Sequence, residues 1–268
     1  MNGPTGRAFD KTFIVGLGAS AGGLEALREL LEEARPQDGV AYVVVQHLDP
    51  THESLMAEIL RRYTSLPVQQ VTGGEKVAGG QVYIIPPGSA LRIEDGVLQL
   101  ENFEAPRGLR RPIDTFFRSL SLDQNEDAIC VVLSGTGGDG STGLKFVKEN
   151  GGLCIAQEPA SAKYDGMPTA AIATGIVDYV LTPSEIAPAI VEFIRRQRGG
   201  APPAPSVDED REDVLRTLRA AVGHDFSRYK ETTLGRRIER RLQVLGLDSV
   251  AEYLALLRED ADEPRRMM

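Results

Sequence analysis

Apolar runs of strand length alternate with helical patterns along the first three quarters of the chain. The first run starts at Phe13 and breaks at glycines before Ser20, and leucines then recur at steps of three and four residues, which predicts a strand, a tight turn and a helix. Uninterrupted apolar runs at 40–45 and 128–133 predict strands buried on both faces, as is typical of parallel sheets. We therefore predict an α/β fold built on an open parallel sheet.

The apolar runs become shorter between residues 81 and 100. Apolar runs at 81–85, 91–93 and 97–100 are separated by turn residues, and Asp95-Gly96 between alternating apolar positions indicates a hairpin. This segment predicts an antiparallel extension of the parallel sheet. Further helices are expected over 51–63, around Phe116 and Phe117, and over 144–150, and the two phenylalanines are expected in the core.

The last quarter of the chain is separated from the rest by a stretch rich in Gly and Pro, which is typical of a linker. Helical patterns follow it over 208–222, 234–245 and 250–258. The predicted organisation is an N-terminal tail, an α/β domain, a linker and a small all-α domain, over residues 1–11, 12–197, 198–207 and 208–268.

Composition narrows the class of protein. The 268 residues carry a net charge of -9, which argues against a general affinity for nucleic acid or for an anionic membrane surface. No apolar run approaches the roughly 20 residues of a membrane span, and the polar start of the chain does not resemble a signal peptide. Cys130 and Cys154 lie within apolar runs, so we expect buried, reduced thiols and a cytoplasmic protein.

The turn after the first strand admits three interpretations. The segment Gly16-Leu17-Gly18-Ala19-Ser20-Ala21 fits the dinucleotide fingerprint, whose glycines let the backbone bind a pyrophosphate. Alternatively, Ser20 is a nucleophile held outward by a sharp turn, or it is simply the N-cap of the following helix. The second strand ends at Gln46 and His47, where a dinucleotide site would require an acidic residue. The fingerprint therefore lacks its second half.

Three chemically distinct side chains follow three different strands. Ser20 and His47 come directly after the first two, and Asp139 lies in the glycine-rich loop after the strand at 128–133. The carboxyl ends of parallel strands meet at one edge of a sheet, so these residues could form a nucleophile, a base and an orienting acid. Each also has an ordinary structural interpretation, and for Asp139 this is a cap on the following helix.

Several segments together resemble the catalytic domain of the chemotaxis protein-glutamate methylesterases, the CheB family. The resemblance covers roughly residues 12–197. It rests on Gly18-Ala19-Ser20-Ala21-Gly22-Gly23, Val45-Gln46-His47, Tyr83-Ile84-Ile85-Pro86-Pro87-Gly88, Arg111-Pro112-Ile113-Asp114, Ser134-Gly135-Thr136-Gly137-Gly138-Asp139-Gly140, Lys163-Tyr164-Asp165-Gly166-Met167-Pro168 and Gly175-Ile176-Val177-Asp178.

The resemblance implies a doubly wound, mostly parallel sheet with an antiparallel hairpin and a serine hydrolase that demethylates receptor glutamates. By resemblance, the catalytic residues are Ser20, His47 and Asp139. The backbone around Ala21 and residues 135–138 would bind the oxyanion, and the loop at 164–168 would flank the cleft. The reaction needs no cofactor or metal, and its partner is a methylated chemoreceptor. Deamidation of receptor glutamines is a further expected activity.

The tail has a resemblance of its own. Phe226-Ser227-Arg228-Tyr229-Lys230 and the segment 233–242 are similar to the start of the chemotaxis receptor methyltransferases, the CheR family, which begin with a small helical domain. The chain therefore resembles part of a fusion of the two families, in which no methyl transfer is expected. The four arginines of one helix are expected to form a basic face that either meets acidic receptor helices or is simply solvated, namely Arg236, Arg237, Arg240 and Arg241.

Two other functions remain open from the sequence. One is a catalytically inactive sensory scaffold that recruits receptor or signalling partners. The other is a nucleotide-binding regulator that uses the first glycine turn. Many relatives begin with a phosphorylatable receiver domain, whereas the first strand here starts near Thr12, so control by receiver phosphorylation is not expected within this chain.

Overall fold

A computed structural model describes residues 12–46, 55–102, 110–198, 213–214, 216–218, 231–247, 249–260 and 263–266. The chain forms two compact units, Met1–Pro188 and Ala189–Met268, and each is described by itself. The division between them falls inside helix α6 (Pro183–Arg198). The domain bounds expected from the sequence, which end the α/β domain at residue 197, stay a prediction.

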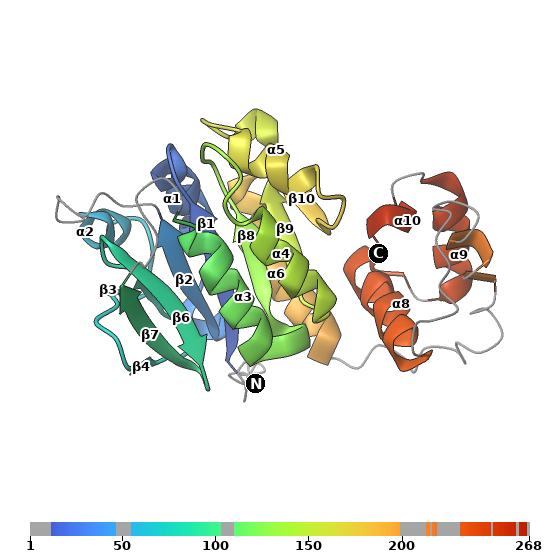
Figure 1. Cartoon of the computed structure of the whole chain (residues 1–268), viewed down its shortest axis with the longest axis horizontal. Coiled ribbons are helices and arrows are strands. Elements are labelled where there is room, and N and C mark those ends of the chain that lie inside the picture. The colour runs from blue at the N-terminus through green and yellow to red at the C-terminus, as the bar shows by residue number, and fades with distance from the viewer. Residues whose placement is uncertain are drawn as a thin grey trace, which may run out of the picture. The chain divides into compact units, whose positions relative to one another are not determined.

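The first unit is built on a seven-stranded sheet in the order β10-β9-β8-β1-β2-β5-β3, in which every neighbouring pair is parallel. The chain adds strands on one side of β1 first and then returns to add strands on its other side, which confirms the doubly wound fold (Figure 1). The strands are β1 (Phe13–Ala19), β2 (Val40–Gln46), β3 (Val68–Gln70), β5 (Val82–Ile84), β8 (Ile129–Val132), β9 (Leu153–Gln157) and β10 (Tyr179–Leu181).

A separate antiparallel sheet contains β4 (Glu75–Lys76), β6 (Ser89–Glu94) and β7 (Val97–Asn102), in the order β4-β7-β6. Asp95 and Gly96 both have positive φ and join β6 to β7, as a two-residue hairpin turn requires. The hairpin is therefore confirmed, but the run at 81–85 was assigned to the wrong sheet. It forms β5, which is buried and pairs in parallel with β2 and β3.

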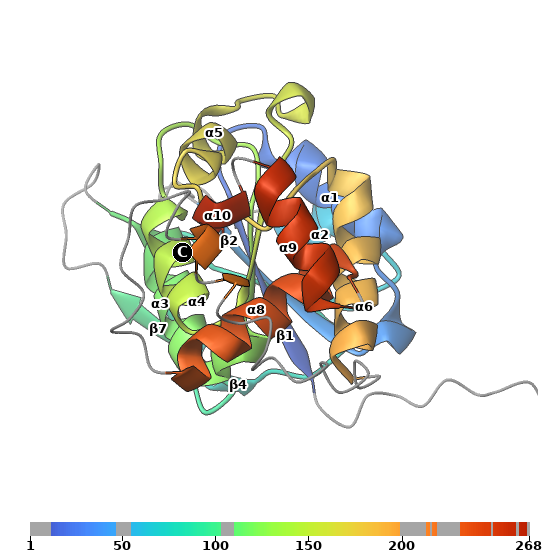
Figure 2. The same cartoon turned by 90° about the vertical axis from the view of Figure 1, so that its right-hand side faces the viewer.

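Helices cover both faces of the parallel sheet. Helix α1 lies on one face, and α3 and α4 lie side by side on the other (Figures 1 and 2). The described part of the helix expected at 51–63 spans only α2, and α4 starts three residues earlier than expected. The helices are α1 (Gly23–Glu33), α2 (Met56–Leu60), α3 (Pro112–Gln124), α4 (Ser141–Glu149), α5 (Gly166–Ile172) and α6, with 3-10 turns η1 (Pro36–Asp38), η2 (Asn125–Asp127) and η3 (Pro159–Ser161).

The glycines of β1 make room for α3. A Cβ on Gly16 would lie 3.1–3.2 Å from the rings of Phe116 and Phe117, and one on Gly18 would overlap the side chain of Ile113. Both glycines lie within the strand, not in the turn after it. Helix packing thus accounts for the two glycines that gave the chain its partial dinucleotide fingerprint.

The core between the sheet and α3 contains the expected aromatic residues. Phe116 and Phe117 are fully buried, as predicted, and pack with aliphatic side chains of the sheet and of α4. Cys130 and Cys154 are buried, reduced thiols that face each other in register on β8 and β9. Burial raises the pKa of the Cys130 thiol, so its neutral form persists at physiological pH.

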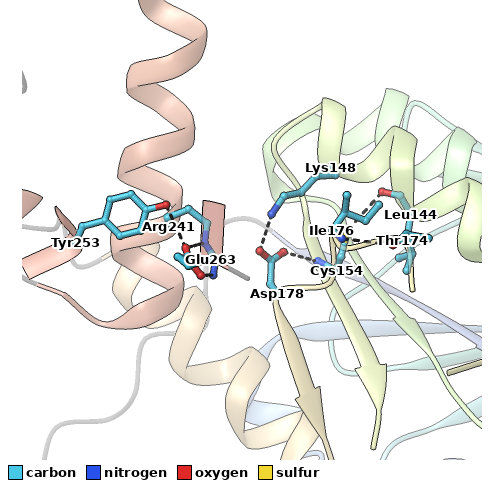
Figure 3. A network of polar contacts seen from close by, with 9 residues as sticks. All are labelled: Leu144, Lys148, Cys154, Thr174, Ile176, Asp178, Arg241, Tyr253 and Glu263. Carbon is cyan, nitrogen blue, oxygen red and sulfur yellow. Dashed lines mark hydrogen bonds and ion pairs between the residues drawn. The ribbon is translucent and has the colours of Figure 1, made fainter. Parts of the chain in front are cut away.

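A buried ion pair ties α4 to the segment before β10 (Figure 3). Lys148 Nζ lies 2.6 Å from Asp178 Oδ1, and Asp178 Oδ2 accepts the backbone N–H of Cys154 at 3.0 Å. The side chain of Asp178 is completely buried, so its charge depends on these contacts. Asp178 thus has a structural role in the motif Gly175-Ile176-Val177-Asp178.

We expect Lys148→Met to destabilise the first unit by about 2–4 kcal/mol, because it removes the cation that pairs with the buried carboxylate of Asp178. The matched change Arg92→Met breaks the exposed pair between Arg92 and Glu101 and is expected to cost at most about 1 kcal/mol. Urea unfolding of both variants measures the difference. Equal midpoints for the two variants would contradict the importance of the buried pair.

The second unit contains a small helical core. Helices α8 (Glu231–Leu245), α9 (Val250–Glu259) and α10 (Glu263–Arg266) contribute to it, and residues 213–214 and 216–218 are helical too. Apolar residues of these segments form one cluster around Ile238 and Tyr253. None of the helices in the described part of the chain is long and apolar enough to cross a membrane.

The expected basic face of the tail is not a uniformly solvated surface. Arg241 is 2% exposed and pairs with Glu263, and Arg240 is 9% exposed with its guanidinium 4.0 Å from the centre of the Phe193 ring. The prediction of a shared basic face was wrong for these two arginines, because the helical core and an aromatic ring cover them. Arg237 is partly buried, and the side chain of Arg236 lies outside the described residues.

Candidate functional site

Ser20 lies at the point where the order of the strands reverses. It follows β1 directly, and β1 is flanked by β2 on one side and β8 on the other. The Ser20 N–H donates to the carbonyl of Ser134 at 3.0 Å, and the Leu133 N–H donates to the carbonyl of Gly18 at 2.8 Å. The loops after β1 and β8 are therefore joined at the carboxyl edge, where open α/β sheets bind their ligands.

Ser20 is not the cap of α1. The N-cap residue is Gly22, which has a φ of 70°, and Ser20 lies two residues before it. The carbonyl of Ser20 accepts the N–H of Gly23 at 3.0 Å, so the backbone of Ser20 belongs to the turn. The interpretation of Ser20 as a helix cap was wrong, and its partly exposed side chain is left for another role.

Gln46 connects the end of β2 to the same turn. It is the register partner of Ala19, and its side-chain Nε2 donates to the carbonyl of Ser20 at 3.2 Å. In the sequence, Ser20 follows Ala19 and His47 follows Gln46. His47 itself lies outside the described residues, so its role stays a prediction.

Asp139 is held by the backbone of α3. Its Oδ2 accepts the N–H of Ile113 at 3.1 Å, and its Oδ1 accepts the N–H groups of Asp114 and Gly140 at 3.0 and 2.9 Å. The side chain is buried. The expectation that Asp139 caps the helix following it was wrong, because its carboxylate caps α3 instead. Three backbone donors favour its ionised form.

Asp114, which the sequence analysis quoted in a motif without giving it a role, lies beside Asp139. Its Oδ1 accepts the N–H groups of Gly140 and Gly143 at 2.9 and 2.7 Å. Burial and the neighbouring charge of Asp139 raise the pKa of Asp114 to about 6. The sequence does carry a signal for such a residue, because an acidic side chain two positions after Pro112 indicates the first turn of a helix.

The segment before α5 packs against the joined loops. Ser134 Oγ accepts the N–H of Tyr164 at 3.1 Å and lies 3.0 Å from the carbonyl oxygen of Ala21. The N–H of Gly135 donates to the carbonyl of Tyr164 at 3.0 Å, and the carbonyl of Gly135 accepts the N–H of Met167. Because its N–H is occupied, Gly135 does not fit the expected role of oxyanion donor in this conformation.

Gly135 is also a point of close packing beside Ser20. A Cβ at this position would lie 2.9 Å from Ser20 Cβ and would overlap the Met167 sulfur, whereas a Cβ on Gly138 would meet Ala170 at an ordinary 3.5 Å. We expect Gly135→Ala to lower any activity that depends on Ser20 by about 10²-fold, since small misplacements of a reacting group have effects of that size. Gly138→Ala is the matched control, and steady-state kinetics measures both. Equal rates for the two variants would contradict this role of Gly135.

Comparison with known proteins identifies the family. Residues 15–190 match the CheB methylesterase family, and residues 209–268 match the all-alpha domain of the CheR methyltransferases. The chain belongs to the CheB methylesterase family. Its CheB region is thus followed by a CheR-type helical region, in the order expected from the sequence.

Individual relatives agree with this assignment. A protein-glutamate methylesterase/protein-glutamine glutaminase of Pseudomonas aeruginosa is 37% identical over 180 residues, which are 67% of this chain and 54% of that protein. An uncharacterized 104.1 kDa protein from the hypE 3′ region of Rhodobacter capsulatus is 36% identical over 233 residues, which are 78% of this chain and 24% of that protein. The chain thus spans about a quarter to a half of these two relatives.

A solved CheB structure confirms the fold. The crystal structure of the CheB methylesterase catalytic domain of Thermotoga maritima matches with a TM-score of 0.63 and 29% sequence identity, and the match covers 68% of this chain and 99% of that one. The region matched by the CheB family, residues 15–190, includes Ser20, His47 and Asp139.

Proposed function

We propose that this chain is a protein-glutamate methylesterase that hydrolyses γ-methyl esters of chemoreceptor glutamates with Ser20, His47 and Asp139. The observation that carries the proposal is the joining of the β1 and β8 loops at the strand-order reversal, in a chain of the CheB family. Ser20 follows β1, and the loop after β8 ends in Asp139.

Ser20 is the nucleophile of the proposed reaction. Its hydroxyl attacks the ester carbonyl while His47 takes the proton, and the collapse of the tetrahedral intermediate expels the methoxide group, to which His47 gives the proton so that methanol leaves. A water molecule activated by His47 then hydrolyses the acyl-enzyme and releases the receptor glutamate. The contact between Gln46 and the carbonyl of Ser20 supports this assignment, because it ties the residue before His47 to the nucleophile's own turn.

Asp139 is the orienting acid. A carboxylate that accepts the imidazole N–H fixes the neutral tautomer needed for proton abstraction and stabilises the imidazolium that forms. The three backbone donors on Asp139 support this role, since they hold the carboxylate rigidly and favour its charged form. The proposed oxyanion donors are the N–H groups of Ala21 and Thr136, which flank the joined loops.

The proposed substrates are methylated cytoplasmic segments of chemoreceptors. Glutamine deamidation is proposed as a second activity, because an amide passes through a similar tetrahedral intermediate. The experiment measures methanol released by the chain from tritium-methylated receptor in isolated membranes, together with ammonia released from receptor glutamines. Release of methanol at a rate proportional to enzyme supports the proposal. Receptor binding without methanol release would instead identify a non-catalytic scaffold.

A further inference from the structure

The first turns of α3 and α4 are capped reciprocally, each by a carboxyl group that belongs to the segment of the other helix. Within the described residues, neither helix is capped by the side chain of its own N-cap residue. Asp139, which precedes α4, caps α3, whereas Asp114 in the first turn of α3 caps α4 through the N–H groups of Gly140 and Gly143. Each carboxyl group therefore fixes the helix to which the other is attached.

This reciprocal capping brings the carboxyl groups of Asp114 and Asp139 close together. The N–H of Gly140 lies 2.9 Å from Oδ1 of Asp114 and also 2.9 Å from Oδ1 of Asp139. Two groups that share one donor in this way repel each other when both are ionised. The positive ends of the two helix dipoles reduce this repulsion but do not remove it.

The two members of the pair have different surroundings. Asp139 accepts three backbone N–H groups, whereas burial and the charge of Asp139 raise the pKa of Asp114 to about 6. After burial, the charge of Asp139 and its contact with Asp114 raise the pKa of Asp114, whereas the N–H groups of Gly143 and Gly140 lower it. Asp114 is therefore the member that takes up a proton.

We propose that Asp114 is a positioning residue of the esterase site, which holds the Asp139 carboxylate in place by capping α4 and adjusts the charge next to it by gaining or losing a proton. This proposal rests on the proposed function, because it assigns to Asp114 an action on the acid that orients His47. Asp114 acts on the reaction only through Asp139.

A neutral residue in place of Asp114 should shift the acid limb of the pH profile of kcat/KM to lower pH. Above about pH 6 the ionised Asp114 adds a negative charge near the site, and this charge favours the imidazolium form of His47. In Asp114→Asn the amide oxygen still accepts the N–H groups of Gly140 and Gly143, but the charge is absent. The pKa of His47 falls, so the base is neutral at lower pH and the acid limb of kcat/KM moves down by about 0.5–1 pH unit.

The stability of the variant has its own pH dependence. The folded-state pKa of Asp114 is higher than its ordinary value of 3.8, so ionising Asp114 opposes folding. This penalty is absent below about pH 4 and fully present above about pH 6. The melting temperature of Asp114→Asn minus that of the original protein should therefore be more positive at pH 8 than at pH 4.

The test measures kcat/KM between pH 5 and 9 for the full chain, Asp114→Asn and Asp139→Asn, and the pKa of His47 by NMR in each. Asp114→Ser, which is also neutral and keeps an acceptor, is the second variant in case the first folds poorly. The proposal predicts that Asp114→Asn keeps at least a third of the plateau rate with a lowered acid limb and a lowered pKa of His47. In Asp139→Asn, kcat/KM should be lower by about 10³- to 10⁴-fold at every pH.

Two results would overturn the proposal. One is an unchanged acid limb and an unchanged pKa of His47 in Asp114→Asn, and the other is a uniform loss of rate with no shift in pH. If the original protein shows no esterase activity, the proposed function fails, but the NMR titration still decides whether Asp114 acts on His47 through Asp139. The failures of the two proposals are therefore distinguishable.

Discussion

Replacing Ser20 by alanine is expected to lower kcat for methanol release by about 10³- to 10⁶-fold, since the loss of the nucleophilic serine has effects of this size in serine hydrolases. The fold should persist, because the hydrogen bonds of Ser20 to Ser134, Gly23 and Gln46 all use its backbone. Radiolabelled methanol release from methylated receptor membranes measures the rate, and circular dichroism checks the fold.

The matched control is Ser184→Ala, which removes an exposed serine hydroxyl from the first turn of α6. It should keep the original rate within about twofold. A folded Ser20→Ala protein that releases methanol as fast as Ser184→Ala would show that Ser20 is not the nucleophile. If the protein were an inactive scaffold, neither the original protein nor the variants would release methanol faster than the background hydrolysis of the ester.

Replacing Arg241 by alanine should destabilise the helical unit by about 3–5 kcal/mol, because it removes the buried cation that binds the carboxylate of Glu263 through two hydrogen bonds. Arg241 Nε and a terminal guanidinium nitrogen each lie 2.7 Å from an oxygen of Glu263, and Tyr253 donates its hydroxyl to the same carboxylate at 3.1 Å (Figure 3). Burial raises the pKa of Tyr253, so it remains a neutral donor at physiological pH. Hydrogen exchange of α8 and α9 in the full chain measures the loss.

Two further variants separate the buried pair from a general effect of arginine removal. Arg237→Ala, on the same helix but only partly buried, should cost at most about 1 kcal/mol. The double change Arg241→Met with Glu263→Met should cost much less than Arg241→Ala, because neither member of the ion pair is then buried without the other. The prediction is wrong if Arg241→Ala exchanges no faster than Arg237→Ala. Esterase activity should be retained in all three proteins.

Hydrophobic periodicity predicted the fold well for the strands that are buried on both faces. Strands β1, β2 and β8 contain only hydrophobic residues and glycine apart from Gln46 at the end of β2, because both of their faces are covered, so their runs could be read directly. The short run that forms β5 was recognised as a strand, but its neighbours depend on long-range pairing. A three-residue apolar strand carries no information on whether its partners are parallel.

The site was only partly predictable for a similar reason. The glycine turn and Ser20 were visible in the sequence, but the packing of Gly16 and Gly18 against α3 depends on a helix about a hundred residues later. In the same way, Asp114 meets Asp139 only because α3 and α4 are neighbours. The burial of Arg241 was missed because helical periodicity places four arginines on one side of α8 but does not show that α10 brings a carboxylate to one of them.

The most direct test of the proposed chemistry is covalent labelling of the native full chain with a fluorophosphonate, followed by mass spectrometry of the labelled peptide. The proposed mechanism predicts one adduct per chain on Ser20, no adduct on urea-unfolded protein, and little or no labelling of a folded His47→Ala variant. Labelling of a different serine, or labelling of Ser20 that is unchanged in His47→Ala, would contradict the mechanism.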